Sequence, residues 1–372
     1  MIIGGRDMTR YLESDILVWL SSININNSSI KKLSNYFSDL REILEIDPDR
    51  LYKISGIKPE LIQKIITNRK KDKIDYILKQ LKDSHIKTIT YLDDNYPISL
   101  NNIYDSPAVL YKKGELKKVD RFAIAIVGAR KATAYGKWAC EKFTKELVDL
   151  GVTIISGLAL GIDSVAHKTA LKCGGRTIAI LGNGLDIKYP RNNENLYDEI
   201  RKNGAILTEF PIGTQPLAFN FPQRNRIISG LSLAVIVIEA KEKSGSLITA
   251  HHALEQGKDI FAVPGNINSI YSAGTNKLIK DGAFPLLDID DILYEVNELK
   301  LKNYKDKSIN IDYSTLSETE IQIVDIIKEG PIHCDMIVYK TGLDTSTVIS
   351  VLTILELKGI IKELTSRTYS IR

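Results

Sequence analysis

The segment FAIAIVGAR, residues 122–130, decides the fold class of this chain. It is a continuous apolar run that ends in a glycine turn, which is typical of a strand buried on both faces. A helical pattern follows it and ends at Gly151. The strand pattern recurs in VTIISGLALG (152–161), RTIAILGNG (176–184), LAVIVIEA (233–240) and KDIFAVPGNI (258–267). Because apolar strands that alternate with helices form covered parallel sheets, we predict a Rossmann-like, doubly wound, mostly parallel α/β domain.

Different patterns flank this domain on both sides. Up to residue 85, apolar residues recur at three- and four-residue spacings, and LYKISGIKPELIQKII (51–66) indicates a short αα-hairpin. The C-terminal residues indicate three helices and a two-stranded wing. We therefore predict a small all-α module similar to sterile-alpha-motif or helix-hairpin-helix domains at 1–85, a Rossmann-like core at 86–296, a polar linker at 297–314 and a winged helix at 315–372.

Composition excludes several classes of protein. The chain has 372 residues, 44% of them hydrophobic and 26% charged, which is ordinary for a soluble globular protein. No apolar run approaches the ~20 residues of a membrane helix, and the N-terminus does not resemble a signal peptide. The three cysteines, Cys140, Cys173 and Cys334, fit neither a disulfide framework nor a zinc spacing. We expect a cytoplasmic protein without a membrane partner and without a metal.

The net charge does not identify a binding partner, but the distribution of charge along the chain limits where an anion could bind. The net charge is +4, so an anion-binding surface must be a local arrangement. Residues 311–372 carry 6 Lys and Arg against 9 Asp and Glu, which disfavours phosphate binding by the winged helix. We expect a protein-contact or packing role for that domain. The alternative is that the winged helix binds DNA and the core is only a scaffold.

Two glycine turns after predicted strands offer candidate binding residues. In the first, Gly128 allows close backbone approach to a ligand, and Arg130 carries a planar cation suited to phosphate. The alternative is a plain turn with an arginine that pairs with a carboxylate. In the second, Gly157 and Gly161 flank the turn. Three polar residues follow: Asp163 and His167, which we expect to support the loop because a metal site needs more ligands, and Lys168, a binding candidate.

Standard nucleotide-binding motifs are absent from the sequence. Neither turn fits GxGxxG, no GxxxxGK[ST] occurs, and no acidic residue ends the strand in RTIAILGNG. An ordinary NAD enzyme and a P-loop ATPase are therefore excluded, and we expect no cofactor.

Two further segments bracket the strand LAVIVIEA and supply rings, cations and a helix start. They are FNFPQRNRIISGLS (219–232) and EAKEKSGSLITAHHALEQGK (239–258). The candidates are Phe221 or Phe219, Arg224, Arg226, Lys243, Gly245, Ser246, Thr249 and Lys258. Rings and cations along strand ends suit single-stranded nucleic acid, whose bases stack and whose phosphates attract cations. The phenylalanines could equally fill the core, and both alternatives stay open at this point.

The order and spacing of several motifs resemble one known family. They are VGARKATAYG (127–136), ISGLALGIDSVAHKTAL (155–171), AILGNGLDIKYPRNNENLY (179–197), FPQRNRIISGLS (221–232), AKEKSGSLITAHHALEQGKDIFAVPG (240–265) and GTNKLIKDGA (274–283). Over residues 86–290 the chain is similar to the DNA-processing protein A family, also called DprA or Smf. A helical N-terminal module and a C-terminal winged helix stand where that family has them.

The resemblance implies a function and a site. It implies a cytoplasmic, non-enzymatic protein of natural transformation and homologous recombination. Such a protein binds and protects incoming single-stranded DNA, promotes loading of RecA recombinase, and forms homodimers through the Rossmann-like domain. The implied DNA-binding residues are Gly128, Arg130, Gly157, Lys168, Phe221, Arg224, Asn225, Arg226, Lys243, Ser244, Gly245 and Ser246, with Gly161, Asp163, His167 and Thr249 as loop-supporting residues.

An enzyme is the alternative from a different class. The same core resembles phosphoribohydrolases of the lysine-decarboxylase-like type, whose PGGxGTxxE-like turn carries a catalytic glutamate. Here Thr249 stands where that acid is expected, and the nearby Glu239 and Glu255 have no evident catalytic partner. We therefore rank a nucleotide-processing enzyme second.

Overall fold

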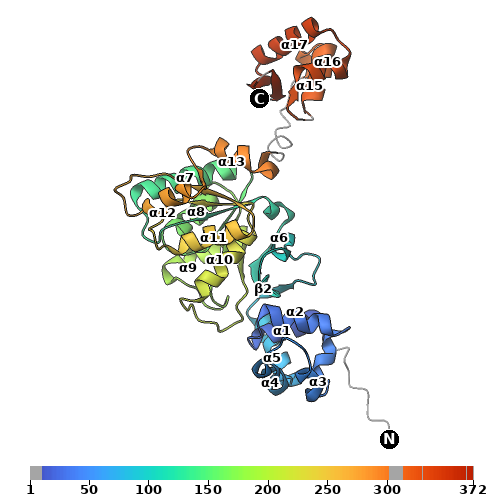
Figure 1. Ribbon diagram of the computed structural model, residues 1–372, viewed down its shortest axis with the longest axis vertical. Helices are drawn as coiled ribbons and strands as arrows, with labels where there is room; N and C mark the ends of the chain where they lie inside the picture. The colour runs from blue at the N-terminus through green and yellow to red at the C-terminus, as the bar shows by residue number, and fades with distance from the viewer. Residues whose placement is uncertain (1–10, 301–312, 329, 366, 372) are drawn as a thin grey trace. The chain divides into compact units, whose positions relative to one another are not determined.

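The computed structural model describes residues 11–300, 313–328, 330–365 and 367–371, and the chain forms two compact units (Figure 1). One unit is Met1–Val296 and the other is Asn297–Arg372. Most of the predicted linker, residues 301–312, lies outside the described residues. Since the first unit contains both the predicted helical module and the predicted core, the boundary at residue 85 stays a prediction.

In the described part of the first unit, nine strands form one sheet in the order β1-β2-β6-β5-β4-β3-β7-β8-β9. Neighbouring strands from β6 to β9 are parallel, whereas β1 and β2 add to one edge in antiparallel fashion. The strands are β1 (Lys87–Thr90), β2 (Val109–Gly114), β3 (Ala123–Val127), β4 (Thr153–Ser156), β5 (Thr177–Ile180), β6 (Ala205–Thr208), β7 (Ala234–Val237), β8 (Asp259–Ala262) and β9 (Phe284–Pro285). The prediction of a mostly parallel sheet is confirmed.

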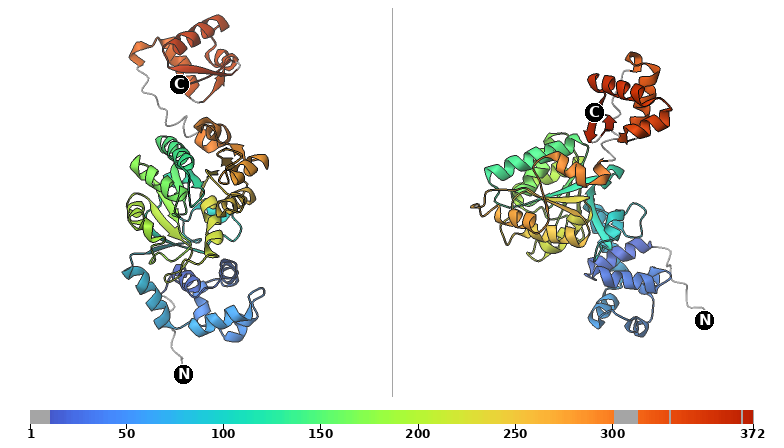
Figure 2. Two further views of the ribbon diagram at one scale, coloured as in Figure 1. Left: turned by 90° about the vertical axis from the view of Figure 1, so that its left-hand side faces the viewer. Right: turned by 45° about the horizontal axis from the view of Figure 1, so that its top comes forward.

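Helices cover both faces of this sheet. The helices that connect β3 to β6 are α7 (Ala134–Asp149), α8 (Ile162–Lys172) and α9 (Glu194–Asn203), and they pack side by side. The chain then returns across the sheet through α10 (Asn220–Gly230), α11 (Gly245–Glu255) and α12 (Ala273–Lys280). Because parallel crossovers are right-handed, opposite directions of travel place the two sets on opposite faces. The left view of Figure 2 shows green helices on one side and yellow and orange helices on the other. The prediction of a doubly wound sheet is confirmed.

The centre of the sheet is also its switch point. β3 and β7 are neighbours, with Ile126 paired to Ile236. α7 follows β3 and α11 follows β7, so the two helices leave toward opposite faces. In such sheets this divergence opens a crevice at the carboxyl ends of the strands. Every residue of β3 and β7 is buried, which explains their uninterrupted apolar sequences.

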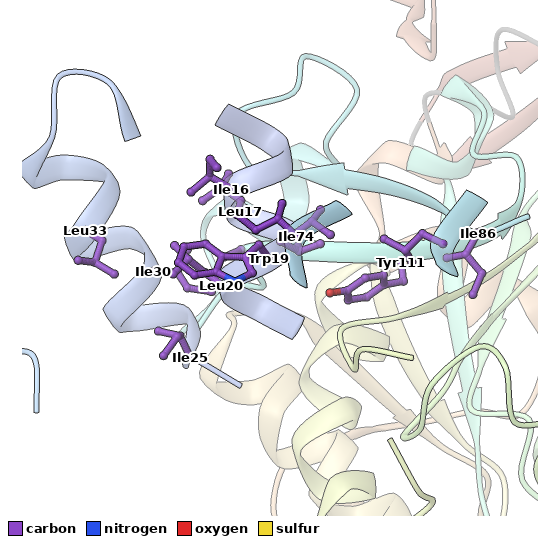
Figure 3. Packing of buried hydrophobic residues seen from close by; sticks show 14 of the residues in the cluster. Ile16, Leu17, Trp19, Leu20, Ile25, Ile30, Leu33, Ile74, Ile86 and Tyr111 are labelled. Atoms are coloured by element: carbon purple, nitrogen blue, oxygen red, sulfur yellow. The ribbon is translucent and has the colours of Figure 1, made fainter. Parts of the chain in front are cut away.

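The segment before β1 is all helical in its described residues. Its elements are α1 (Glu13–Ser22), α2 (Asn27–Tyr36), η2 (Leu40–Leu44), α3 (Pro48–Tyr52), α4 (Pro59–Asn68) and α5 (Lys71–Asp83). Trp19 is fully buried and packs in one hydrophobic cluster with Leu20 and Ile30, and the same cluster extends to Tyr111 of β2 (Figure 3). The Tyr111 hydroxyl donates to Ser21 Oγ at 3.1 Å. The prediction of an N-terminal helical part is confirmed, and its core is continuous with the edge of the sheet.

The second unit is a small domain with its own core. It contains α15 (Glu318–Lys328), β10 (Ile332–His333), α16 (Cys334–Thr341), α17 (Thr345–Leu357), β11 (Ile361–Thr365) and β12 (Thr368–Ile371). β11 and β12 pair in antiparallel fashion as a wing, and β10 pairs with β12. The predicted winged helix is thus confirmed. No helix in the described ranges of either unit is long and apolar enough to cross a membrane.

The shorter helical elements of the first unit complete the chain trace. They are α6 (Ile98–Asn101), η3 (Lys118–Arg121), η4 (Arg191–Asn193) and α13 (Ile289–Glu295). η3 places Arg121 immediately before β3, at the amino end of the strand whose carboxyl end leads to Arg130.

Candidate functional site

A cavity of about 390 Å³ lies at the switch point. Val127 at the end of β3 and residues 128–131 after it form one wall, and Lys241 with residues 243–246, which follow β7, form another. α10 contributes Phe221, Arg224 and Asn225. The cavity therefore joins segments that are far apart in the sequence at the edge where ligands of doubly wound sheets bind.

Arg224 forms part of the cavity lining although its side chain is buried. Its Nη1 group donates to the carbonyl of Gly157 at 2.8 Å and also to the carbonyl of Ile180, which ties the ends of β4 and β5 together. Burial lowers the pKa of Arg224 to about 10, and the nearby Asp163 carboxylate opposes that shift. Gly157 must lack a side chain here, because a Cβ atom would lie 2.6 Å from Arg224 Nη2. Arg224 thus brings a positive charge to the cavity while it holds two strand ends.

Asp163 and Gly161 shape the loop beneath Arg224. The Asp163 carboxylate accepts hydrogen bonds from the backbone N–H groups of Gly157 at 3.1 Å and Ala159 at 3.3 Å. Burial raises the pKa of Asp163, and the Arg224 guanidinium offsets part of that effect. Gly161 has φ +82°, and a Cβ atom on it would lie 2.2 Å from the Ala129 carbonyl oxygen. Asp163 and Gly161 therefore determine the conformation of the loops.

His167 is fully buried behind the same loop. Its Nδ1 lies 2.7 Å from Thr177 Oγ1, and that hydroxyl donates to the Ile154 carbonyl, so Nδ1 carries the proton. Within the described residues, its Nε2 atom has no hydrogen-bond partner. Burial, with a smaller contribution from Arg224, lowers the pKa of His167 to about 3. A neutral, inward-facing imidazole agrees with a supporting role.

The rim of the cavity carries four cations without an acidic partner among the described residues. They are Arg130, Lys131, Lys241 and Lys243, all exposed. Among the residues that the structure describes, none of these four forms an ion pair. Instead, the Arg130 guanidinium lies 5.5 Å from the centroid of the Phe221 ring, and Lys241 lies 5.0 Å from that of Tyr271. Their charge is available to an anion in solution.

The aromatic ring of Phe221 forms part of the cavity wall. It stacks on Tyr189 with centroids 5.8 Å apart and an interplanar angle of 30°, and the Arg224 guanidinium lies 5.8 Å from its centroid. Phe221 also lines a neighbouring smaller hollow of about 60 Å³ together with Tyr189 and Arg130. Phe219, by contrast, is 62% exposed and lines neither space. The sequence left core filling and ligand stacking open, and the position of Phe221 favours the second.

The start of α11 completes the cavity with hydrogen-bond donors. Ser244 caps the helix, its hydroxyl lies 2.8 Å from Ser246 Oγ, and Gly245 leaves the first turn open. The Asn225 amide donates to the Gly245 carbonyl at 3.2 Å and so anchors this turn to α10. Buried Thr249 lines the cavity one turn further along. A helix N-terminus beside unpaired cations suits a phosphate group.

Three predicted cations lie elsewhere. Arg226 is buried against Glu209, with a closest distance of 2.6 Å, and it donates to the Asp105 carbonyl at 2.8 Å. Lys168 is exposed on α8 and does not line the cavity. Lys258 donates to the carbonyls of Ser229 and Gly230, each at 2.8 Å, and stands before β8 at the amino edge. The expectation that Lys258 adds to the carboxyl edge is wrong, because the strand runs between it and that edge.

Sequence reasoning missed several cavity residues. Lys131 and Lys241 are the second cation after β3 and the first after β7, so the rule that selected Arg130 and Lys243 could have found them. Tyr271 and Tyr189 come from long loops, and no local signal places them at the cavity.

The carboxylates near the cavity accept hydrogen bonds that hold loops of the fold in place. Glu239 is 3% exposed and accepts from the Thr133 N–H at 2.9 Å and from the Thr133 hydroxyl at 2.5 Å. It thereby fixes the loop between β3 and α7. Asp163, the carboxylate among the described lining residues, is held by backbone donors as stated above. Among the described residues that line the cavity, cations and backbone donors therefore outnumber the single carboxylate, Asp163.

Comparison with known proteins agrees with the motifs. The family model described as DNA recombination-mediator protein A matches residues 87–297, and one described as DprA winged helix domain matches residues 312–365. DNA processing protein DprA of Bacillus subtilis is 45% identical over 227 residues, which are 61% of this chain and 76% of the relative. Protein Smf of Synechocystis is 37% identical over 289 residues, which are 77% of this chain and 73% of the relative.

Solved structures give the same result. The X-ray structure of DNA processing protein A from Streptococcus pneumoniae superposes with a TM-score of 0.68 at 37% identity, over 77% of this chain and 98% of that one. A structure of DNA processing protein A from Helicobacter pylori, described for its single-stranded DNA binding mode, has a TM-score of 0.52 at 34% identity, over 57% and 96%. Since the first family model covers more than half of the chain, this protein belongs to the DNA recombination-mediator protein A family, also named DprA or Smf.

Proposed function

We propose that this protein binds single-stranded DNA across the cavity at the carboxyl ends of β3 and β7, and that it acts in DNA recombination. The observation that carries the proposal is the group of rim cations. They are Arg130, Lys131, Lys241 and Lys243, which have no ion pair within the described residues. Cations beside the N-terminus of α11 attract phosphate, and phosphate contacts supply most of the affinity of sequence-independent DNA binding. The recombination-mediator family model and the DNA-processing names of the relatives support the same role.

The aromatic wall favours a single strand over a duplex. The Arg130 and Arg224 guanidiniums lie 5.5 and 5.8 Å from the centroid of the Phe221 ring, which also stacks on Tyr189. A base in a duplex is already stacked on its neighbours, whereas an unstacked base can reach such a ring. The Helicobacter pylori relative, which is described by its single-stranded DNA binding mode, supports this preference.

Family likeness supports the finer parts of the proposal. These are protection of incoming DNA during natural transformation, promotion of RecA loading, a homodimer formed through the Rossmann-like domain, and a cytoplasmic location. We further propose that the protein is not an enzyme, because Glu239 and Asp163 are held by other groups of the fold. Incubation with nucleoside monophosphates should release no free base.

Fluorescence anisotropy of a labelled oligo-dT strand tests the main proposal. The wild type, Arg130→Ala and Lys243→Ala are titrated at two salt concentrations. Each substitution should weaken binding, and for each lost contact the slope of log affinity against log salt should become less steep by about 0.7. Arg224→Ala is a poor choice here, because Arg224 also holds β4 and β5.

Arg121→Ala is the matched control. Arg121 is exposed at the amino end of β3, whereas Arg130 follows the carboxyl end of the same strand. Removal of Arg121 changes the net charge equally and should leave the affinity unchanged. Equal losses in Arg121→Ala and Arg130→Ala, or preference for duplex DNA, would contradict the proposed site.

A further inference from the structure

A second aromatic pair lies on α7, beside the cavity. Trp138 and Tyr135 are 58% and 45% exposed, and their rings stack with centroids 6.0 Å apart and an interplanar angle of 29°. They are three residues apart, so they lie on the same face of the helix. Single exposed apolar side chains are common on protein surfaces, whereas contiguous exposed apolar groups, such as two stacked rings, often mark an interaction site. Because both rings are partly exposed, packing within the first unit does not explain why two aromatic residues stand at these positions.

The fold holds this pair in a fixed position at the carboxyl edge. The Tyr135 hydroxyl donates to the Pro264 carbonyl at 2.8 Å, just after β8. Thr133, which caps α7, is bound through its backbone N–H and its hydroxyl to Glu239, just after β7. Lys131, two residues before Thr133, lines the cavity. The rings are therefore anchored to the same strand ends that form the cavity.

Cations flank the pair in the N-terminal part of α7 and in the loop before it. Residues 131–140 carry two lysines, Lys131 and Lys137, and no acid, whereas residues 141–149 balance Lys142 and Lys145 against Glu141, Glu146 and Asp149. Stacked rings interleaved with cations are how proteins bind single strands without sequence preference.

We propose that Tyr135 and Trp138 form a second base-stacking station, so that single-stranded DNA leaves the cavity past Lys131 and runs over the N-terminal half of α7. This inference rests on the proposed function and extends the DNA track beyond the cavity. One station is Phe221 with Tyr189, the other is Trp138 with Tyr135, and the phosphate-binding cavity lies between them.

Tryptophan fluorescence gives a direct test, because the chain has two tryptophans and Trp19 is fully buried in the helical part. Unlabelled oligo-dT should quench the emission of Trp138 in the wild type, and Trp138→Phe should remove that quench while it keeps most of the affinity. Trp138→Ala should weaken binding about fivefold or more, the lower end of what stacking of one base contributes. Tyr104→Ala, which removes a 93% exposed ring between α6 and β2, is the control and should bind as the wild type does.

The outcomes separate this inference from the proposed function. If labelled oligo-dT binds but the emission does not change and Trp138→Ala binds normally, the second station is wrong and the cavity proposal stands. If labelled oligo-dT does not bind at all, both fail. If the emission changes with protein concentration in the absence of DNA and not on adding oligo-dT, the face belongs to a protein contact, and the inference is overturned.

Discussion

Arg224 and Arg226 are two residues apart on α10, and they lie in opposite surroundings. On the cavity side, Arg224 donates to two backbone carbonyls and to Asn225. On the other side, Arg226 forms a two-pronged pair with Glu209, at 2.7 and 2.6 Å. Burial opposes the charge of Arg226, but Glu209 and then Asp105 outweigh it and hold its pKa above the usual range. Residues i and i+2 of a helix do not face each other, so the RNR sequence divides between two environments.

The difference shows what makes a cation available to a ligand. Arg226 is neutralised by carboxylates of the protein itself, so its ion pairs stabilise the fold. The cavity side has Arg224 and four rim cations, and the Asp163 carboxylate there is held by backbone N–H groups. Removing a cation should therefore cost stability on one side of α10 and DNA affinity on the other.

The largest effect should come from breaking the Arg226 pair. Arg226→Met leaves the Glu209 carboxylate, whose side chain is 11% exposed, with the Asn27 amide as a donor but without its cation, and loss of one partner of such a pair costs about 3 kcal/mol of the free energy of unfolding. Urea unfolding followed by the emission of buried Trp19 measures this in the first unit. Lys243→Met, which removes an exposed rim cation, should change the same free energy by less than about 0.5 kcal/mol. An unchanged stability for Arg226→Met, together with a loss of DNA binding, would place Arg226 on the DNA track.

Lowering the pH should decrease the free energy of unfolding, because His167 is buried on the cavity side in its neutral form. Its folded pKa of about 3 lies below the ordinary value of 6.5, so the unfolded chain takes up the proton first as the pH falls. Above pH 6.5, His167 is neutral in both states and has no effect on the free energy of unfolding. Below pH 6.5, it lowers that free energy by about 1.4 kcal/mol for each pH unit, until the pH nears 3. His167→Asn keeps a donor toward Thr177 but cannot titrate, so its unfolding free energy should vary less between pH 6.5 and 4.5. Asp163, whose pKa is raised, acts in the opposite sense and is common to both proteins. Parallel pH profiles for the two proteins would contradict a neutral His167 in the fold.

A smaller effect is expected from Gly161→Ala. The added Cβ would meet the Ala129 carbonyl oxygen at 2.2 Å, so the loop that carries Arg130 must move. We expect a loss of about 1–3 kcal/mol in stability and a fall in DNA affinity similar to that of Arg130→Ala. Gly174→Ala is the control, since Gly174 has a similar positive φ of +72° but no atom within 4 Å of the added Cβ. If both variants bind DNA equally, the position of Arg130 does not depend on this contact.

The sequence allowed the doubly wound fold to be predicted because its central strands are buried on both faces. β3 and β7 appear as uninterrupted apolar runs for that reason. β1 and β2, the two antiparallel strands at one side of the sheet, were not predicted. They are short and contain Lys87, Lys112 and Lys113, which interrupt the apolar pattern of the two segments.

The site was predictable in outline and not in detail. Cations in the loops that follow buried strands, such as Arg130 and Lys243, do line the cavity. Whether a cation has a partner depends on distant residues: Glu209 is 17 positions from Arg226, and Asp105 is 121 positions away. No local pattern reveals such pairs, so Arg224 and Arg226 looked equivalent in the sequence.

The smallest effect should come from Lys168, which the sequence placed beside Arg130. It lies in the second turn of α8, exposed and outside the cavity, so a strand bound across β3 and β7 does not pass over it. Lys168→Ala should change oligo-dT affinity by less than about twofold, the small residual that a screened charge beyond contact distance contributes. Anisotropy beside Arg130→Ala measures the difference. A loss as large as that of Arg130→Ala would mean that the DNA turns over α8 after the Phe221 ring, and the comparison between the two sides of α10 would have to include α8 on the binding side.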